Sequence, residues 1–151
     1  MAIEIASPVS SIVRLQAADL VQLESLLQTN GLPTDDCADQ LDALFGLFDA
    51  GQLIAAGGLE AAGADAWLRS IVVAPTHRCQ GLAARLTEFL IDDARSRNLR
   101  GIYLLTETAD DYFMRFGFAE VERSIAPQMV QKTRQFAGLC PGSATFMRLL
   151  L

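Results

Sequence analysis

The chain has 151 residues, a formal net charge of −6 and a hydrophobic fraction of 51%. This length suits a single domain, residues 1–151, with one core. The acidic balance excludes nucleic acid and anionic membrane surfaces as partners, because both need clustered basic residues. The sequence shows neither a transmembrane stretch nor a signal peptide, so we expect a cytoplasmic protein. The high apolar content would also suit a homodimer.

The metal-binding residue types are few. Cys37, Cys79 and Cys140 have no spacing typical of a metal site, and we expect reduced thiols. His77 is the only histidine, which disfavours zinc catalysis and a serine triad. We therefore expect no metal cofactor.

The apolar patterning predicts alternating strands and helices without repeats or linkers. In chain order it predicts a strand at 11–15, helices at 18–28 and 38–43, strands at 44–48, 53–60 and 66–73, a helix ending at 97, a strand at 102–105, a helix at 109–116, a strand at 118–121, a helix at 127–136 and a strand at 144–150.

The most informative stretch joins the strand at 66–73 to the helix that follows it. The strand ends in Val72-Val73-Ala74-Pro75, and the loop reads Arg78-Cys79-Gln80-Gly81-Leu82-Ala83. A glycine-bearing loop at a helix N-terminus directs free backbone N–H groups at an anion, and Arg78 adds a positive charge. This loop lacks the lysine and hydroxyl of a P-loop and the three glycines of a dinucleotide loop. It therefore predicts a phosphate site of another kind.

The loop Arg-x-x-Gly-x-Ala resembles the acetyl-CoA signature of the GNAT superfamily of N-acetyltransferases. The order of predicted elements resembles the GNAT fold over nearly the whole chain, and Arg115-Phe116-Gly117-Phe118 resembles a second GNAT marker. The resemblance implies an α/β (α+β) fold with a mixed, mostly antiparallel central sheet and helices on both faces. It also implies strands that splay apart beside the phosphate loop.

The same resemblance implies transfer of an acetyl group from acetyl-CoA to a small-molecule amine by direct attack in a ternary complex. We expect the pantetheine arm to lie along the strand end like an added strand, with a backbone N–H near Val72 or Val73 polarising the thioester carbonyl. The expected cofactor-binding residues are Ile71, Val72, Val73, Arg78, Cys79, Gln80, Gly81, Leu82, Ala83 and Ala84.

The C-terminal part narrows the resemblance. Residues 133–136, Thr-Arg-Gln-Phe, followed by Leu139-Cys140-Pro141, resemble the arsenic-resistance N-acetyltransferase subgroup. This likeness suggests an amino-acid-like acceptor. The acidic chain would equally suit a polyamine.

Three residues are candidates for proton transfer. Glu60 and Glu107 stand at strand ends, where a carboxylate can deprotonate an ammonium or bind its charge, although most glutamates are simply solvated. We place Glu60 ahead of Glu107, because Thr106 and Thr108 flank Glu107 and are themselves candidate inward-facing groups. Members of the superfamily usually have a tyrosine that acts as the general acid at the position where this chain has Phe113. In this chain the nearest tyrosine, Tyr112, is one residue earlier. One helical step rotates a side chain by about 100°. We therefore expect a packing role for Tyr112, with solvent protonating the thiolate.

Three further residues are candidates for acceptor binding. Arg69 stands in an apolar strand, so it either reaches solvent or binds an anionic acceptor, with Glu60 as another possible partner. Strand alternation places Arg69 on the face of Trp67, Ile71 and Val73. Thr106 is a candidate inward-facing group.

Arg134 is the third candidate, and it could hold a carboxylate or lie on the surface.

A different class of function also fits the absence of a tyrosine at the usual place. The chain would then be a catalytically inactive GNAT-like module that binds CoA or an amine as a sensor.

Overall fold

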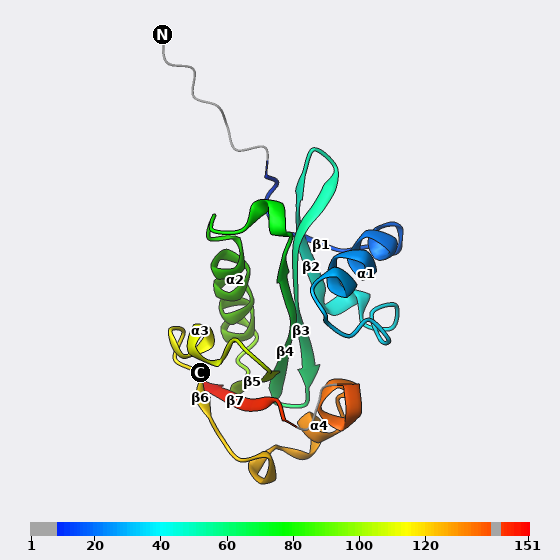
Figure 1. Cartoon of the computed structure of the whole chain (residues 1–151). Coiled ribbons are helices and arrows are strands. Elements are labelled where there is room, and N and C mark those ends of the chain that lie inside the picture. Colours follow the sequence, from blue (N-terminus) through cyan, green and yellow to red (C-terminus); the bar gives the residue numbers. More distant parts are fainter. Residues whose placement is uncertain (1–8, 140–142) are drawn as a thin grey trace.

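The computed structural model describes residues 9–139 and 143–151, whose strands form one seven-stranded sheet with helices on both faces (Figure 1). The strand order is β1-β2-β3-β4-β5-β7-β6, and every neighbouring pair is antiparallel except β4 and β5. The predicted fold class is thereby confirmed. The strands are β1 (Val13–Arg14), β2 (Leu44–Asp49), β3 (Gln52–Ala62), β4 (Asp65–Val73), β5 (Gly101–Thr106), β6 (Ala119–Glu120) and β7 (Thr145–Leu150).

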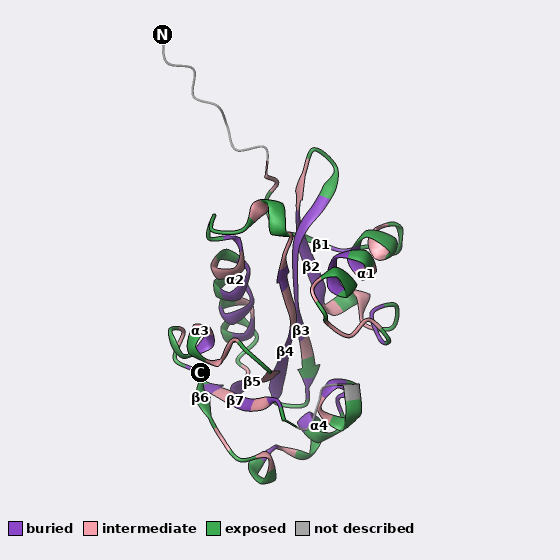
Figure 2. Ribbon diagram, viewed as in Figure 1, coloured by how far each residue is buried: buried purple, intermediate pink, exposed green. Residues whose placement is uncertain are grey.

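The helices divide between the two faces of the sheet. Helices α2 (Leu82–Ser96) and α3 (Asp110–Met114) lie on one face, and α1 (Leu20–Thr29) lies on the other (Figure 1). Each long helix turns an apolar stripe inward, and the buried residues line both faces of the sheet (Figure 2). None of the helices in the described ranges is long and apolar enough to span a bilayer.

Two of the predicted helices are wrong. The segment 38–43 forms turns and a 3₁₀ helix, Leu41–Ala43, because it lacks an apolar stripe. The predicted helix at 127–136 is broken into α4 (Gln128–Gln131) and a π turn (Gln135–Leu139). The Thr133 hydroxyl lies at the break, where it donates to the Val130 carbonyl at 2.8 Å and accepts from the Phe136 N–H at 3.4 Å. Such local side-chain bonds compete with a continuous helix.

A β-bulge interrupts β4. Ala56 pairs with Val72 and Gly58 pairs with Arg69, so two residues of β4, Ser70 and Ile71, lie opposite a single residue of β3. Ser70 has a φ of 60°, which accommodates the extra residue. The bulge reverses the alternation of side chains beyond this point.

The bulge corrects one expectation about Arg69. Ile71 and Val73 pack with the α2 side of the core, whereas Val72 packs in the cluster that contains Leu23 of α1. Arg69 bonds to the segment after α1, so it does not share a face with Ile71 and Val73 as simple alternation predicts. An extra residue in a strand moves every later side chain to the opposite face.

The parallel strands β4 and β5 diverge soon after they meet. They pair only at Ala66 with Ile102 and at Trp67 with Tyr103, while β5 stays paired with β7 as far as Thr106. The edge of β4 that faces β5 is therefore unpaired from Leu68 onward. This divergence opens the middle of the sheet, as the predicted splaying requires.

Candidate active site

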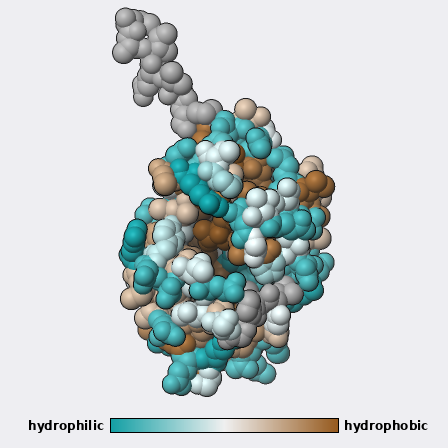
Figure 3. All heavy atoms as spheres, viewed as in Figure 1, coloured by the Kyte–Doolittle hydropathy of each residue, from teal (hydrophilic) through white to brown (hydrophobic). Residues whose placement is uncertain are grey.

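A cavity of about 950 Å³ lies where β4 and β5 diverge. Figure 3 shows the molecule hollowed between its α1 and α2 sides, with hydrophobic side chains at the bottom. The cavity walls come from the segment after α1, the end of β4, the start of α2, the end of β5 with α3, and the π turn. The lining residues are Asn30, Gly31, Leu32, Pro33, Asp35, Leu68, Arg69, Ser70, Ile71, Val72, Val73, Arg78, Ala83, Leu104, Leu105, Thr106, Glu107, Thr108, Ala109, Tyr112, Phe113, Gln135 and Ala144.

The predicted phosphate loop forms one mouth of this cavity. Cys79 and Gly81 both have positive φ, 62° and 73°, and α2 begins directly after Gly81. None of the backbone N–H groups of residues 78–84 donates to another described residue. A Cβ built on Gly81 would meet nothing within 4 Å. Free N–H groups in an open, left-handed turn at a helix N-terminus fit a diphosphate.

The residues predicted to bind the cofactor lie around this mouth. Arg78 and Ala83 line the cavity, while the side chain of Leu82 is buried in the core. The Arg78 guanidinium donates to the Asn30 side-chain oxygen and, at 3.4 Å, to the Val73 carbonyl. Cys79, Gln80 and Gly81 are exposed, and Ala84 is half-buried.

The unpaired edge of β4 connects the phosphate loop with the deeper part of the cavity. Ile71, Val72 and Val73 all line the cavity, although their side chains also belong to the core clusters. Apart from the Val73 carbonyl, which accepts from Arg78, their backbone groups have no strand partner on the side from which β5 has departed. An extended chain such as a pantetheine arm fits this edge.

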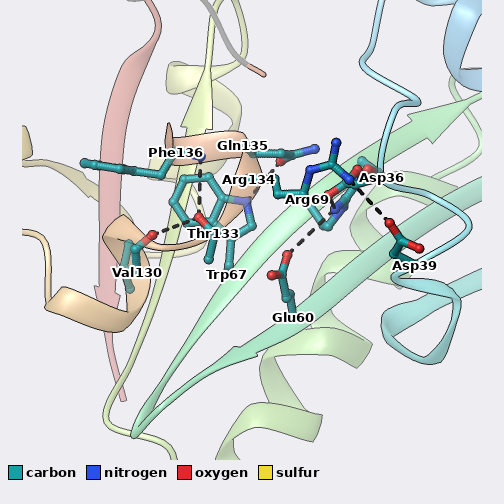
Figure 4. A network of polar contacts seen from close by, with 11 residues as sticks. Asp36, Asp39, Glu60, Trp67, Arg69, Val130, Thr133, Arg134, Gln135 and Phe136 are labelled. Atoms are coloured by element: carbon teal, nitrogen blue, oxygen red, sulfur yellow. Dashed lines mark hydrogen bonds and ion pairs between the residues drawn. The ribbon is translucent and has the colours of Figure 1, made fainter. Parts of the chain in front are cut away.

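A buried ion pair stands at the other end of the cavity. Arg69 and Asp36 are 2% and 0% exposed, and both guanidinium NH₂ groups donate to the two oxygens of the Asp36 carboxylate (Figure 4). The Arg69 Nε–H donates to the Ser70 hydroxyl at 3.1 Å. Arg69 is thus neither exposed nor unpaired. Sequence reasoning missed Asp36, although an arginine inside an apolar strand requires a carboxylate partner somewhere.

Glu60 belongs to the same network but does not line the cavity. Its Oε2 lies 3.7 Å from an Arg69 nitrogen and accepts no hydrogen bond from any described residue. Burial raises the pKa of Glu60, and the neighbouring Arg69 offsets this only in part. A carboxyl group in this position resists ionisation.

Replacing Glu60 with glutamine should therefore stabilise the protein at neutral pH. A carboxyl whose pKa is raised by folding favours the folded state below its unfolded pKa, near 4.5, and this contribution is lost as the pH rises through the folded value. Glutamine mimics the protonated form at every pH. Thermal unfolding should give equal midpoints near pH 4.5 and a higher midpoint for Glu60→Gln at pH 8. A lower midpoint at pH 8 would contradict the raised pKa.

Glu107 and Thr106 follow β5 into the cavity wall. Glu107 is exposed, and Thr106 uses its hydroxyl to accept the Ala109 N–H at 3.0 Å. Within residues 9–139 and 143–151, no three His, Cys, Asp or Glu side chains are grouped as metal ligands. Cys37 and Cys79 are free thiols, and Cys140 lies outside the described residues.

Tyr112 lines the cavity from α3. Its hydroxyl is buried and has no hydrogen-bond partner among the described residues. Burial raises the pKa of Tyr112, while the nearby Thr87 hydroxyl lowers it to a smaller extent. Phe113, which occupies the usual place of the tyrosine, packs in the core and touches the same cavity.

The structure separates Arg134 from this site. Arg134 is exposed and lies 3.4 Å from the exposed Asp39, and it does not line the cavity. The next residue, Gln135, is 5% exposed and does line it. Its Oε1 accepts the indole N–H of Trp67 at 3.0 Å (Figure 4). Sequence reasoning missed Gln135 because the break at Thr133 sets which side chain turns inward.

Comparisons with known proteins agree with this geometry. The model of the acetyltransferase (GNAT) family matches residues 14–118, and no curated protein matches the chain. N-acetylglutamate synthase from Neisseria gonorrhoeae, solved with coenzyme A and N-acetyl-glutamate, has a TM-score of 0.80 at 18% identity over 95% of this chain. This chain spans only 35% of that synthase.

Two other solved structures match over nearly their whole length. Rv2747 from Mycobacterium tuberculosis, solved with CoA, has a TM-score of 0.77 at 15% identity over 94% of this chain and 99% of its own. The ribosomal-protein-S18-alanine N-acetyltransferase from Escherichia coli has a TM-score of 0.71 at 23% identity over 93% of this chain and 92% of its own. At these identities the likeness establishes the fold.

Proposed function

Because this chain belongs to the GNAT acetyltransferase family, we propose that it transfers an acetyl group from acetyl-CoA to the amine of a small, amino-acid-like acceptor. The observation that carries the proposal is the cavity itself. It runs from a loop of free N–H groups with Arg78, along the open edge of β4, to a polar end that contains Arg69 and Gln135. These features match the diphosphate, the pantetheine arm and a polar acceptor.

The proposed reaction is direct attack in a ternary complex. The neutral amine nitrogen bonds to the acetyl carbon and loses one proton, the carbon–sulfur bond breaks, and CoA leaves as a thiolate that takes up a proton from solvent. A backbone N–H of residues 71–73 would stabilise the charge that develops on the carbonyl oxygen. The residues proposed to hold acetyl-CoA are those of 71–73 and 78–84.

The ammonium of the acceptor must lose a proton before it attacks. Of the two glutamates considered, Glu107 is the better candidate for this base because it lines the cavity, whereas Glu60 touches the site only through Arg69. An exposed carboxylate can accept the proton directly or through water.

Tyr112→Phe is expected to change kcat by no more than a few-fold. Burial raises the pKa of Tyr112, which makes its hydroxyl a weaker proton donor at neutral pH. A thiol has a pKa of about 8.5, so the thiolate is a good leaving group without a proton donor. The variant should also be at least as stable as the wild type, since it removes a buried hydroxyl without a partner. A hundredfold loss of kcat with acetyl-CoA binding intact would identify Tyr112 as the general acid.

Calorimetry with acetyl-CoA, followed by assays of thiol release with a panel of amines, tests the proposed function. The panel holds amino acids, polyamines and peptide N-termini, together with an arsenic-containing amino acid suggested by the C-terminal motif. Turnover of amino-acid-like amines supports the proposal. Binding of acetyl-CoA without turnover of any amine would favour the sensor module, and turnover of polyamines alone would overturn the amino-acid-like acceptor.

A further inference from the structure

Gln135 places an amide at the acceptor end of the cavity in a fixed orientation. The residue is only 5% exposed, and it lines the cavity together with Arg69. The Oε1 atom accepts the Trp67 indole N–H at 3.0 Å. An indole nitrogen can only donate, so the amide must present its oxygen to Trp67 and its NH₂ group to the other side.

The orientation is rigid because Trp67 cannot move. Trp67 is fully buried in β4, and its ring lies edge-on to Phe136 at 6.3 Å and stacked on Phe146 at 6.4 Å between centroids. Turning the Gln135 amide over would leave the indole N–H facing another donor. The two conformers therefore differ by at least one buried hydrogen bond.

The NH₂ group of Gln135 has no hydrogen-bond partner among the residues that the structure describes. Its Nε2 donates to none of the described residues. It also does not belong to the buried side-chain atoms without a hydrogen-bond partner, so it is open to the cavity. In Figure 4 it points away from Trp67, to the side on which Arg69 lies. A donor that is held in place and left unpaired beside a cavity is suited to a ligand oxygen.

The guanidinium of Arg69 is not available to bind this ligand oxygen. Asp36 holds both NH₂ groups of the guanidinium, so the buried pair is neutral as a whole. Recognition at this end of the cavity therefore rests on hydrogen-bond donors more than on net positive charge. Such a site binds a carboxylate and also tolerates its uncharged carboxamide, because both carry an acceptor oxygen.

We propose that Gln135 is a specificity-determining residue whose Nε2 amide, oriented by Trp67, donates to the carboxyl oxygen of the amine acceptor. This inference rests on the proposed function and deepens it. The site selects amines that carry an oxygen acceptor next to the reacting nitrogen. It rejects the matching amine without the carboxyl group, because the Gln135 donor would then be desolvated without a partner.

Two sets of probes test this, each with an amino acid, its α-carboxamide and the amine without the α-carboxyl group. The sets are L-glutamate, L-isoglutamine and 4-aminobutyrate, and L-alanine, L-alaninamide and ethylamine. In the wild type, the amino acid and its carboxamide should both have a kcat/KM at least tenfold higher than the amine without the α-carboxyl group, in at least one of the two sets. Equal rates for all three members in both sets would overturn the proposal.

Two substitutions separate orientation from packing. Gln135→Met keeps the length and removes the donor, so the amino acid should fall to the level of the amine without the carboxyl group. Gln135→Glu keeps an oxygen for Trp67 and presents a carboxylate oxygen to the cavity, so the amino acid should lose at least a hundredfold while the carboxamide is retained. Gln128→Met, an exposed glutamine in α4, should leave every rate unchanged.

The outcomes distinguish the inference from the function on which it rests. Acetyl-CoA binding, measured by calorimetry, should be unchanged in all variants and reports that each is folded. Wild-type selectivity in both Gln135 variants overturns the role of Gln135 and leaves the acetyltransferase activity standing. If acetyl-CoA binds and no amine of the panel or the probe sets is acetylated, the proposed function fails and the inference falls with it.

Discussion

Replacing Asp36 with alanine is expected to lower the free energy of unfolding by about 3–5 kcal/mol. Arg69 is 2% exposed, and the substitution leaves its charge buried without a carboxylate that binds both of its NH₂ groups. Glu60, at 3.7 Å and with a raised pKa, is a poor replacement. Chemical denaturation at pH 7 measures the loss.

A second ion pair of the same segment provides the control. Asp39→Ala removes the partner of Arg134, whose side chain is 51% exposed, while Asp39 itself is 74% exposed. Solvent screens that pair, so the cost should stay below about 1 kcal/mol. The double variant Asp36→Leu/Arg69→Met should recover much of the stability, because both charges of the buried pair are removed together. Equal losses for Asp36→Ala and Asp39→Ala would show that the Arg69 pair is not specially buried.

Features encoded within one short stretch could be predicted from the sequence. The strand, the loop and the start of α2 are contiguous, and the positive φ of Gly81 with its free N–H groups follows from local chemistry. The resemblance of the element order to the GNAT fold likewise implied the mixed sheet and its opening beside the loop. These are the parts of the site that we predict to hold an anion.

Contacts between distant residues could not be predicted in this way. Asp36 and Arg69 are 33 residues apart, and Trp67 and Gln135 are 68 residues apart. Asp36 follows a polar run that reads as an ordinary loop. A single sequence does not show which residues of two distant segments lie opposite each other. It therefore predicts that Arg69 needs an acidic partner and does not identify that partner.

The bulge at Ser70 and the break at Thr133 explain the remaining errors. The bulge adds one residue to a strand, and the break interrupts a helix. Either change is enough to turn a side chain inward that a regular element would turn outward. The bulge moved Ile71 to the α2 side, and the break turned Gln135 inward where Arg134 had been considered. These two irregularities set which side chains, among them Ile71 and Gln135, line the cavity.

The segment between α1 and β2 is tied to three other parts of the fold. Arg69 of β4 binds Asp36, Arg78 of the phosphate loop donates to the Asn30 side chain, and Arg134 pairs with Asp39. The same segment supplies one wall of the cavity. These contacts hold this wall of the cavity to β4, to the loop that contains Arg78 and to the segment that contains Arg134.

Replacing Gly81 with valine is expected to weaken acetyl-CoA binding at least a hundredfold. Gly81 has a φ of 73°, and a β-branched residue is strained there by roughly 1–2 kcal/mol. The side chain would also fill the space above residue 81, where a Cβ now meets nothing within 4 Å. Both effects act on the free N–H groups that the diphosphate needs. Calorimetry with acetyl-CoA measures the change.

Gly51→Val is the matched control, because it imposes the same backbone strain elsewhere. Gly51 lies in the turn between β2 and β3, has a φ of 82°, and also leaves a Cβ without neighbours within 4 Å. It does not line the cavity. The two variants should lose similar stability, and only Gly81→Val should lose the cofactor. If both bind acetyl-CoA as tightly as the wild type, the diphosphate does not rest on this loop, and the cofactor must enter the cavity from another side.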